Sequence, residues 1–287
     1  MKKLLSIALV TVLCAFLLAA CGGEKPAESE GEPPADPGAQ TETDAPADAD
    51  AGDLAKITAA GKMVIGITNY EPMNYYDDKG ELIGFDTEYT KAVCEKLGVE
   101  PEFIEIEWDN KEIELNAGNI DAIWNGMTYT AERDENMDFA KPYVKNDIVV
   151  VVQKANAGKY KTIADLAGLE IAAEDGSTGA DAVENNPDLE ASLQGVASLV
   201  DSLMEVNAGT ADAASVDSTM AKELVGKDAY KDLVILPDII LSEEVLAIGF
   251  RTGSDLPAKI DEITAELVAD GTLAALAEKY KVAFFYE

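Results

Sequence analysis

The pattern of hydrophobic and polar positions changes at Leu54. Residues 22–53 contain no aromatic residue and no Val, Ile or Leu, whereas later residues form short apolar runs alternating with stretches of helical periodicity. Buried strands are continuous apolar runs, and amphipathic helices repeat their apolar positions about every 3.6 residues. The alternation therefore predicts an α/β fold with largely parallel sheets.

The predicted strands are apolar runs between polar or turn residues. They cover 62–68, 102–108, 121–125, 147–154, 169–173, 211–216, 233–236 and 245–250. The predicted helices have apolar residues at helical spacing, and some end next to a glycine. They cover 86–97, 111–117, 163–167, a stretch from about Ala180, 198–207, 218–225, 257–270 and 273–280.

The N-terminus has the pattern of an export signal. The chain begins with MKK, continues as an apolar run and reaches Ala19-Ala20-Cys21. A basic start, a short apolar core and small residues are typical of a secretory signal, and the run is shorter than the roughly 20 residues of a spanning helix. The end of this run resembles a bacterial lipobox. That resemblance implies removal of residues 1–20 and a lipid on Cys21; the alternative is an ordinary signal peptide in which Cys21 is incidental.

Residues 21–53 are rich in acidic residues and proline, and we expect them to form a disordered tether. The formal net charge of -33 argues against nucleic acid and against adhesion to anionic lipid. The chain contains no histidine, which excludes Ser-His-Asp and Cys-His nucleophiles and the usual zinc sites. Cys94 is the only cysteine after Cys21, and its place on an apolar helix face predicts a buried small hydrophobe. We expect no cofactor and no metal.

Several short motifs follow one another in a specific order between residues 63 and 280. They are YEPM at 70–73, GFD at 84–86, GNID at 118–121, GMT at 126–128, TAER at 130–133, DF at 138–139, PY at 142–143, DGT at 270–272 and EKY at 278–280. In this order the chain resembles the extracytoplasmic solute-binding proteins of polar amino acid ABC transporters, family 3. The resemblance implies a two-lobed periplasmic-binding-protein-like fold of type 2. Each lobe would be a mainly parallel sheet flanked by helices, and the two would be joined by a hinge with two chain crossings.

The resemblance also implies lobe bounds. Lobe 1 would contain residues 54–145 and 246–287, lobe 2 would contain residues 146–245, and the ligand would lie between them.

An amino acid site needs a clamp for the ligand carboxylate. The chain has only two arginines, and Arg133 is the better candidate because a planar guanidinium can bind a carboxylate through two hydrogen bonds. From the residues alone, an ion pair between Arg133 and Glu132, Asp134 or another surface acid is an equal alternative. The resemblance implies that Arg133 and Thr128 bind the ligand carboxylate and that the Gly126 carbonyl accepts from the ammonium.

Four further positions match binding residues of the family. Thr178 would bind the carboxylate from lobe 2, Asp217 would bind the ammonium, and Tyr70 and Trp108 would sandwich the ligand. From the residues alone, Asp217 could equally be a helix N-cap, and the loop at Thr178 an ordinary turn. Trp124 could face either the core or the cleft.

The resemblance implies a lipid-anchored receptor outside the cell membrane that delivers an amino acid to an ABC transporter permease. We expect a monomer that does not change its ligand chemically. An enzyme of the dehydratase type is the alternative, and Glu71, Glu112 or Lys141 would then have to act as acid or base. A sensing domain is a third reading. We expect a polar-neutral or a basic ligand, because the predicted side-chain end of the pocket is polar. Its residues are Thr68, Asn69, Glu71, Asn74, Trp108, Glu112 and Asn125.

Overall fold

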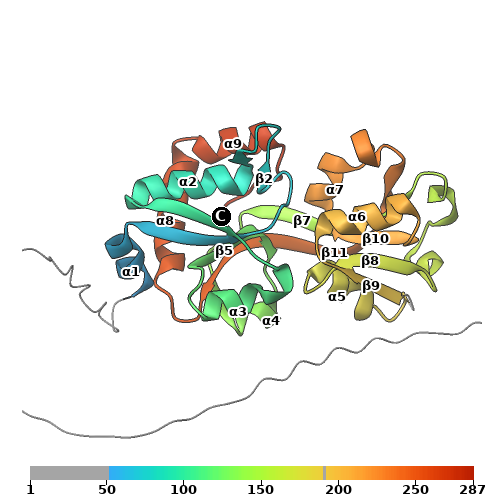
Figure 1. Ribbon diagram of the computed structural model, residues 1–287, viewed down its shortest axis with the longest axis horizontal. Helices are drawn as coiled ribbons and strands as arrows, with labels where there is room; N and C mark the ends of the chain where they lie inside the picture. The colour runs from blue at the N-terminus through green and yellow to red at the C-terminus, as the bar shows by residue number, and fades with distance from the viewer. Residues whose placement is uncertain (1–51, 190–191) are drawn as a thin grey trace, which may run out of the picture. The chain divides into compact units, whose positions relative to one another are not determined.

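The computed structural model describes residues 52–189 and 192–287 (Figure 1). The predicted signal peptide 1–20, the lipidation site Cys21 and nearly all of the tether lie outside this part. One end of the tether is corrected, because Asp53 is the first residue of helix α1 (Asp53–Ala60) and is buried. Its carboxylate lies 3.2 Å from the guanidinium of Arg251, a partner that local composition could not reveal.

Nine strands form a single mixed sheet. In sheet order they are β4 (Glu100–Glu105), β1 (Lys62–Ile67), β5 (Ala122–Thr128), β11 (Leu233–Arg251), β7 (Val144–Gln153), β10 (Ala213–Asp217), β8 (Glu170–Glu174) and β9 (Ser192–Val196), with β6 (Met137–Phe139) paired to β11. The outer strands pair in parallel at both ends of this order: β1 pairs with β4 and β5, and β8 pairs with β10 and β9. The hairpin β2 (Tyr75–Tyr76) and β3 (Leu82–Ile83) stands apart.

The two halves of the sheet are joined by β7 and β11, which pair antiparallel over most of their length. Two separate strands were predicted within β11, at 233–236 and 245–250. They are one strand of 19 residues, because the segment between them continues the ladder after register shifts near Ile240: Glu244 pairs with Asn146 and Glu243 with Asp147. Side-chain polarity interrupts the apolar pattern there, but backbone hydrogen bonds do not depend on it. The α/β, two-lobed prediction is confirmed, with antiparallel strands at the junction.

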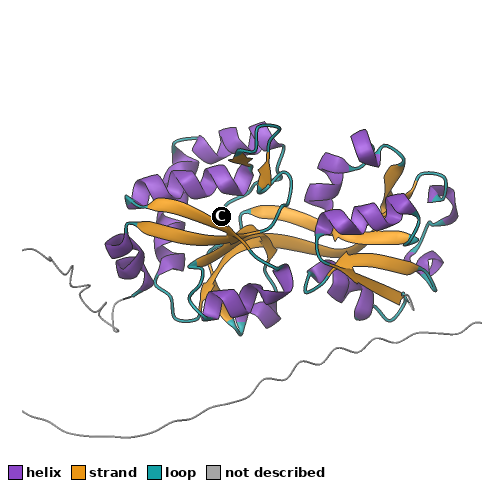
Figure 2. Ribbon diagram, viewed as in Figure 1, coloured by secondary structure: helices purple, strands orange, loops and turns teal. Residues whose placement is uncertain are grey.

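Helices cover both faces of the sheet in each half (Figure 2). They are α2 (Phe85–Leu97), α3 (Lys111–Asn116), α4 (Ala131–Asp134), α5 (Thr178–Glu184), α6 (Leu199–Ala208), α7 (Ser218–Leu224), α8 (Leu256–Ala269) and α9 (Thr272–Tyr280). Short 3-10 helices occur at η1 (Trp108–Asn110), η2 (Ala157–Lys159), η3 (Ile163–Leu166) and η4 (Asp228–Tyr230). Within residues 52–189 and 192–287, no helix is both long and apolar enough to cross a membrane.

The core of the first half packs aromatic residues of α2 against the sheet. Trp124 is fully buried there, with its ring edge-on to Tyr89 at a centroid distance of 4.8 Å, so it belongs to the core and not to the cleft. Cys94 is also fully buried, and burial raises the pKa of its thiol to about 12. A thiol that stays protonated and inaccessible acts as a small hydrophobe, as predicted.

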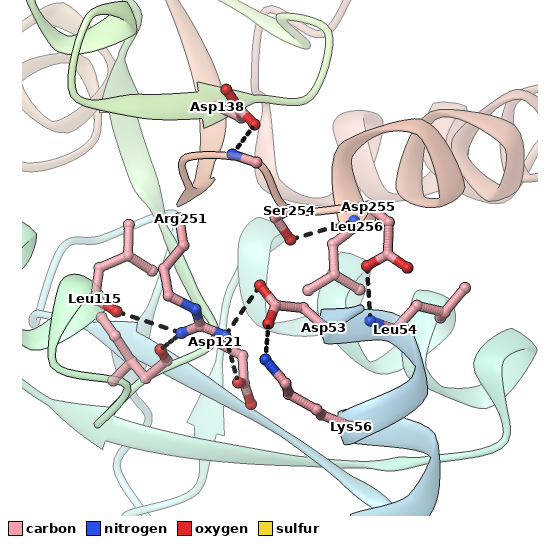
Figure 3. A network of polar contacts seen from close by, with 12 residues as sticks. Asp53, Leu54, Lys56, Leu115, Asp121, Asp138, Arg251, Ser254, Asp255 and Leu256 are labelled. Atoms are coloured by element: carbon pink, nitrogen blue, oxygen red, sulfur yellow. Dashed lines mark hydrogen bonds and ion pairs between the residues drawn. The ribbon is translucent and has the colours of Figure 1, made fainter. Parts of the chain in front are cut away.

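Arg251, the second arginine, has a structural role at the end of β11 (Figure 3). Its guanidinium donates to the carbonyls of Ile120, at 2.6 Å, and Leu115, and it lies 3.2 Å from both Asp121 and Asp53. These contacts connect α1, the loop before β5 and the end of β11. A guanidinium has five N–H donors in a fixed plane, so it can satisfy several acceptors at once.

Candidate ligand-binding site

A cavity lies between the two halves of the sheet. It is lined by Tyr70, Trp108, Asn125, Gly126, Thr128, Arg133, Glu174, Ser177, Thr178, Leu199 and Asp217. All seven residues predicted to bind the ligand are among them. Five residues predicted for the side-chain end are not, namely Thr68, Asn69, Glu71, Asn74 and Glu112. Asn74 instead lies fully buried behind Asn125, to which its amide donates at 2.8 Å.

Strand β5 brings Gly126 and Thr128 to the wall of the cavity. Gly126 has a φ of 56°, and a Cβ added to it would lie 2.7 Å from Cε1 of Tyr70. Only glycine combines this conformation with this close approach. The N–H of Gly126 donates at 2.7 Å to Asp86, a fully buried carboxylate that also accepts from Tyr143. Asp86 therefore fixes the backbone of the binding strand from behind.

Arg133 points into the structure instead of pairing with a surface acid. Arg133 is only 7% exposed, and its guanidinium donates to the carbonyl of Thr128 at 2.9 Å and to that of Gly176 at 3.2 Å. The short helix α4 sets its direction, since the backbone N–H of Arg133 is capped by the Thr130 hydroxyl. The surface ion pair considered as an alternative does not form among the described residues. A buried guanidinium without a carboxylate partner is a suitable clamp for an anion.

Thr128 and Thr178 face each other across the two halves, with 3.3 Å between their hydroxyl oxygens. Both hydroxyls donate to the same oxygen of Glu244 on β11, at 2.8 and 3.2 Å. Burial raises the pKa of the Glu244 carboxyl. No local motif pointed to Glu244, because its side chain reaches the site only through the continuous strand β11.

Asp217 ends strand β10 with its side chain turned toward the cavity. It occupies the N-cap position of α7, but its side chain makes no capping hydrogen bond, and its carboxylate accepts from the Asn146 amide at 2.5 Å. Burial raises the pKa of Asp217 to about 7, with a further contribution from the nearby Glu244. A bound cation would favour its charged form, which is the property an ammonium clamp needs.

Trp108 and Tyr70 provide aromatic walls. Trp108 does not end a strand as predicted, because β4 stops at Glu105 and Trp108 begins the 3-10 helix η1. The ammonium nitrogen of Lys111 lies 5.0 Å from the centre of the Trp108 ring and donates to the carbonyl of Gly176 at 2.9 Å. Burial lowers the pKa of Lys111 to about 8. Lys111 and Arg133, both in the first half, thus donate to the same carbonyl, that of Gly176 in the second half.

The family model described as bacterial extracellular solute-binding proteins, family 3, matches residues 63–283. The chain belongs to this family. This confirms the resemblance read from the motifs, and it places the protein outside the cytoplasm.

Three relatives of this family member illustrate the similarity. The L-cystine-binding protein TcyJ of Escherichia coli (strain K12) is 30% identical over 239 residues, which cover 81% of this chain and 87% of TcyJ. The structure of Tv2483 bound to L-arginine is 30% identical with a TM-score of 0.74, covering 79% of this chain and 93% of that one. The ancestral amino acid-binding protein AncCDT-1, a precursor of cyclohexadienyl dehydratase, is 30% identical with a TM-score of 0.72, covering 80% and 99%.

Proposed function

We propose that the protein binds a free α-amino acid in this cavity, outside the cell membrane, and delivers it to an ABC transporter permease. The observation that carries the proposal is one buried cavity holding both an arginine without a carboxylate partner and an aspartate at the end of a strand. Arg133 suits the ligand carboxylate and Asp217 the ligand ammonium. The names of the relatives, which bind cystine or arginine, support the same class of ligand.

The remaining residues complete the proposed site. The backbone and hydroxyl groups of Thr128 and Thr178 would surround the carboxylate from both halves, and the Gly126 carbonyl would accept from the ammonium. Tyr70 and Trp108 would flank the aliphatic part. A ligand that contacts both halves favours the closed arrangement by its higher affinity for that arrangement.

The membrane attachment belongs to this proposal as well. A signal peptide at 1–20 and a lipid on Cys21 would hold the protein at the membrane surface, with residues 21–52 as spacer. We also propose that the protein is a monomer. Its lobe 1 would contain residues 54–145 and 246–287, and its lobe 2 would contain residues 146–245. Metabolic labelling with a radioactive fatty acid tests the anchor, because Cys21→Ser should abolish incorporation.

The Arg133→Ala variant tests the site. Loss of a charge-assisted clamp of about 2–4 kcal/mol predicts at least a 30-fold weaker binding of the amino acid in a calorimetric titration. Arg133→Lys keeps the charge but not the two parallel donors, so its affinity should lie between that of the wild type and that of Arg133→Ala. Unchanged affinity in Arg133→Ala would show that the amino acid binds elsewhere.

An elimination enzyme is the second candidate, favoured by the dehydratase lineage of one structural relative. Glu71, Glu112 and Lys141, the acids and base first considered for it, do not line the cavity. Glu174 does line it and has a perturbed pKa, so it is the group that such chemistry would have to use. Recovery of the bound ligand unchanged after prolonged incubation, measured by mass spectrometry, supports the binding function; a product lacking water or carbon dioxide supports the enzyme.

A further inference from the structure

Glu174 is an acidic residue of the cavity that the proposed clamps do not use. It ends strand β8 in the second half of the sheet and is only 3% exposed. Its side chain lines the cavity together with Arg133 and Asp217. Acidic side chains are almost never buried to this extent without a partner, so its position calls for an explanation.

One oxygen of the Glu174 carboxylate, Oε1, has no hydrogen-bond partner among the described residues. Lys111 is close enough to lower the pKa of Glu174 electrostatically, but its ammonium donates to the carbonyls of Trp108, at 3.3 Å, and Gly176. No ion pair joins Lys111 to Glu174 within residues 52–189 and 192–287. A buried acceptor without a partner is costly, and such atoms in native proteins commonly mark a functional site.

The charges of the cavity wall do not match a neutral-side-chain amino acid. The charged lining residues are Arg133, Asp217 and Glu174, one cation and two anions. A zwitterionic amino acid uses Arg133 for its carboxylate and Asp217 for its ammonium. Glu174 is then left either protonated or as a buried charge that the ligand does not compensate, unless the ligand carries a second positive group.

We propose that Glu174 accepts N–H donors from a cationic group at the end of the ligand side chain, and so selects a basic amino acid over neutral ones. This inference rests on the amino-acid-binding function proposed above. It assigns the specificity to Glu174 in lobe 2, whereas the acids expected from the sequence, Glu71 and Glu112, are both on the first half and outside the lining.

The titration of Glu174 gives an independent readout. Burial raises its pKa to about 8, and the nearby Asp217 and Asp201 act in the same direction, whereas Lys111 and the backbone N–H of Leu199 oppose them. Below this pKa the free site must release a proton to bind a cation. Asp217 titrates in the same range but affects cationic and neutral ligands alike. The affinity for a cationic ligand relative to its neutral partner should therefore rise by up to about tenfold per pH unit between pH 6 and pH 8.

Arginine and citrulline are the most direct probes, because they are nearly identical in shape and differ in the charge of the side-chain end. Lysine and norleucine form a second such pair. Each is titrated calorimetrically into the purified wild-type protein, Glu174→Gln and Glu170→Gln. Glu170 is the matched control, since it lies on the same strand β8 but is exposed.

The wild type and Glu170→Gln should bind at least one cationic ligand about 10- to 100-fold more tightly than its neutral partner. In Glu174→Gln this ratio should fall to within a few-fold, and it should no longer change between pH 6 and pH 8. Retained binding of the neutral partner would show that the variant is folded.

Two results would overturn the inference alone. In the first, the wild type binds a neutral amino acid in a way that depends on Arg133 but does not prefer its cationic partner. In the second, Glu174→Gln keeps the same cationic preference as the wild type. Binding of none of the twenty amino acids by the wild type would overturn the proposed function and this inference together.

Discussion

Gly176 is the point where the loop after β8 meets the other half of the structure, and its replacement by alanine tests closure directly. A Cβ added to Gly176 would lie 2.7 Å from Oδ1 and 3.1 Å from Cα of Asp109, and 3.4 Å from the Lys111 ammonium. The Asp109 carboxylate can rotate away, but its Cα moves only with η1. The clash therefore opposes the approach of the two halves.

The magnitude follows from two separate contributions. Gly176 has a φ of 69°, so alanine there costs about 1–2 kcal/mol whether the halves are apart or together. The overpacking against Asp109 adds about 1–2 kcal/mol only when the halves are closed. In the proposed function the ligand favours the closed arrangement, and Gly176→Ala should therefore weaken binding by about 5- to 30-fold.

Gly168→Ala separates these contributions. Gly168 lies in the same half with a φ of 77°, and a Cβ added to it would meet nothing within 4 Å. Both variants should lose similar stability in urea unfolding of the ligand-free protein, whereas only Gly176→Ala should lose affinity in calorimetry. Equal affinities of the two variants would refute the idea that Gly176 is a closing contact.

Gly126→Ala should destabilise the protein by about 2–4 kcal/mol in urea unfolding, whereas Gly226→Ala, which has open space at a similar φ, should cost only about 1–2 kcal/mol. Arg251→Ala should cost about 3 kcal/mol, because two acids lose their partner, and no loss would contradict the network. The free energy of unfolding of the ligand-free protein should fall from pH 4 to pH 7 in urea unfolding. Asp86 and Asp217 have folded pKa values of about 7, so in this range the folded protein binds more protons than the unfolded chain, whose aspartates are already ionised. A rise in stability would contradict this contribution.

Much of the fold could be predicted from local pattern. The apolar runs at β1 and β7 and the glycine after α2 are local signals, and the structure agrees with them within a few residues. Elements held by distant partners could not be found in this way. Helix α1 buries only Asp53 and Ile57, and its first turn is held by Arg251, almost 200 residues further along the chain.

The site shows the same division. Of the seven predicted residues, Tyr70, Gly126, Thr128 and Arg133 lie in the ordered motifs. The other three were placed by their resemblance to family positions, and all seven line the cavity. Glu174 and Glu244 carry no such motif, and each follows or precedes other acidic residues, a pattern typical of a solvated surface. Glu174 lines a cavity together with residues distant in sequence, and Glu244 accepts from Thr128 and Thr178, contacts that no local window of sequence contains. Trp108 was assigned to a strand because β4 and η1 are separated by only two residues.

Thermal melting of the ligand-free protein against the twenty amino acids, ornithine and cystine tests the central claim most directly. Unfolding and refolding the sample before the screen removes any ligand carried through purification. At 100 times the dissociation constant a ligand adds about 2.7 kcal/mol, so the melting temperature should rise by about 5–10 °C with at least one amino acid, and not with its decarboxylated analogue such as agmatine for arginine. No rise with any amino acid, or an equal rise with the decarboxylated analogue, would contradict the account.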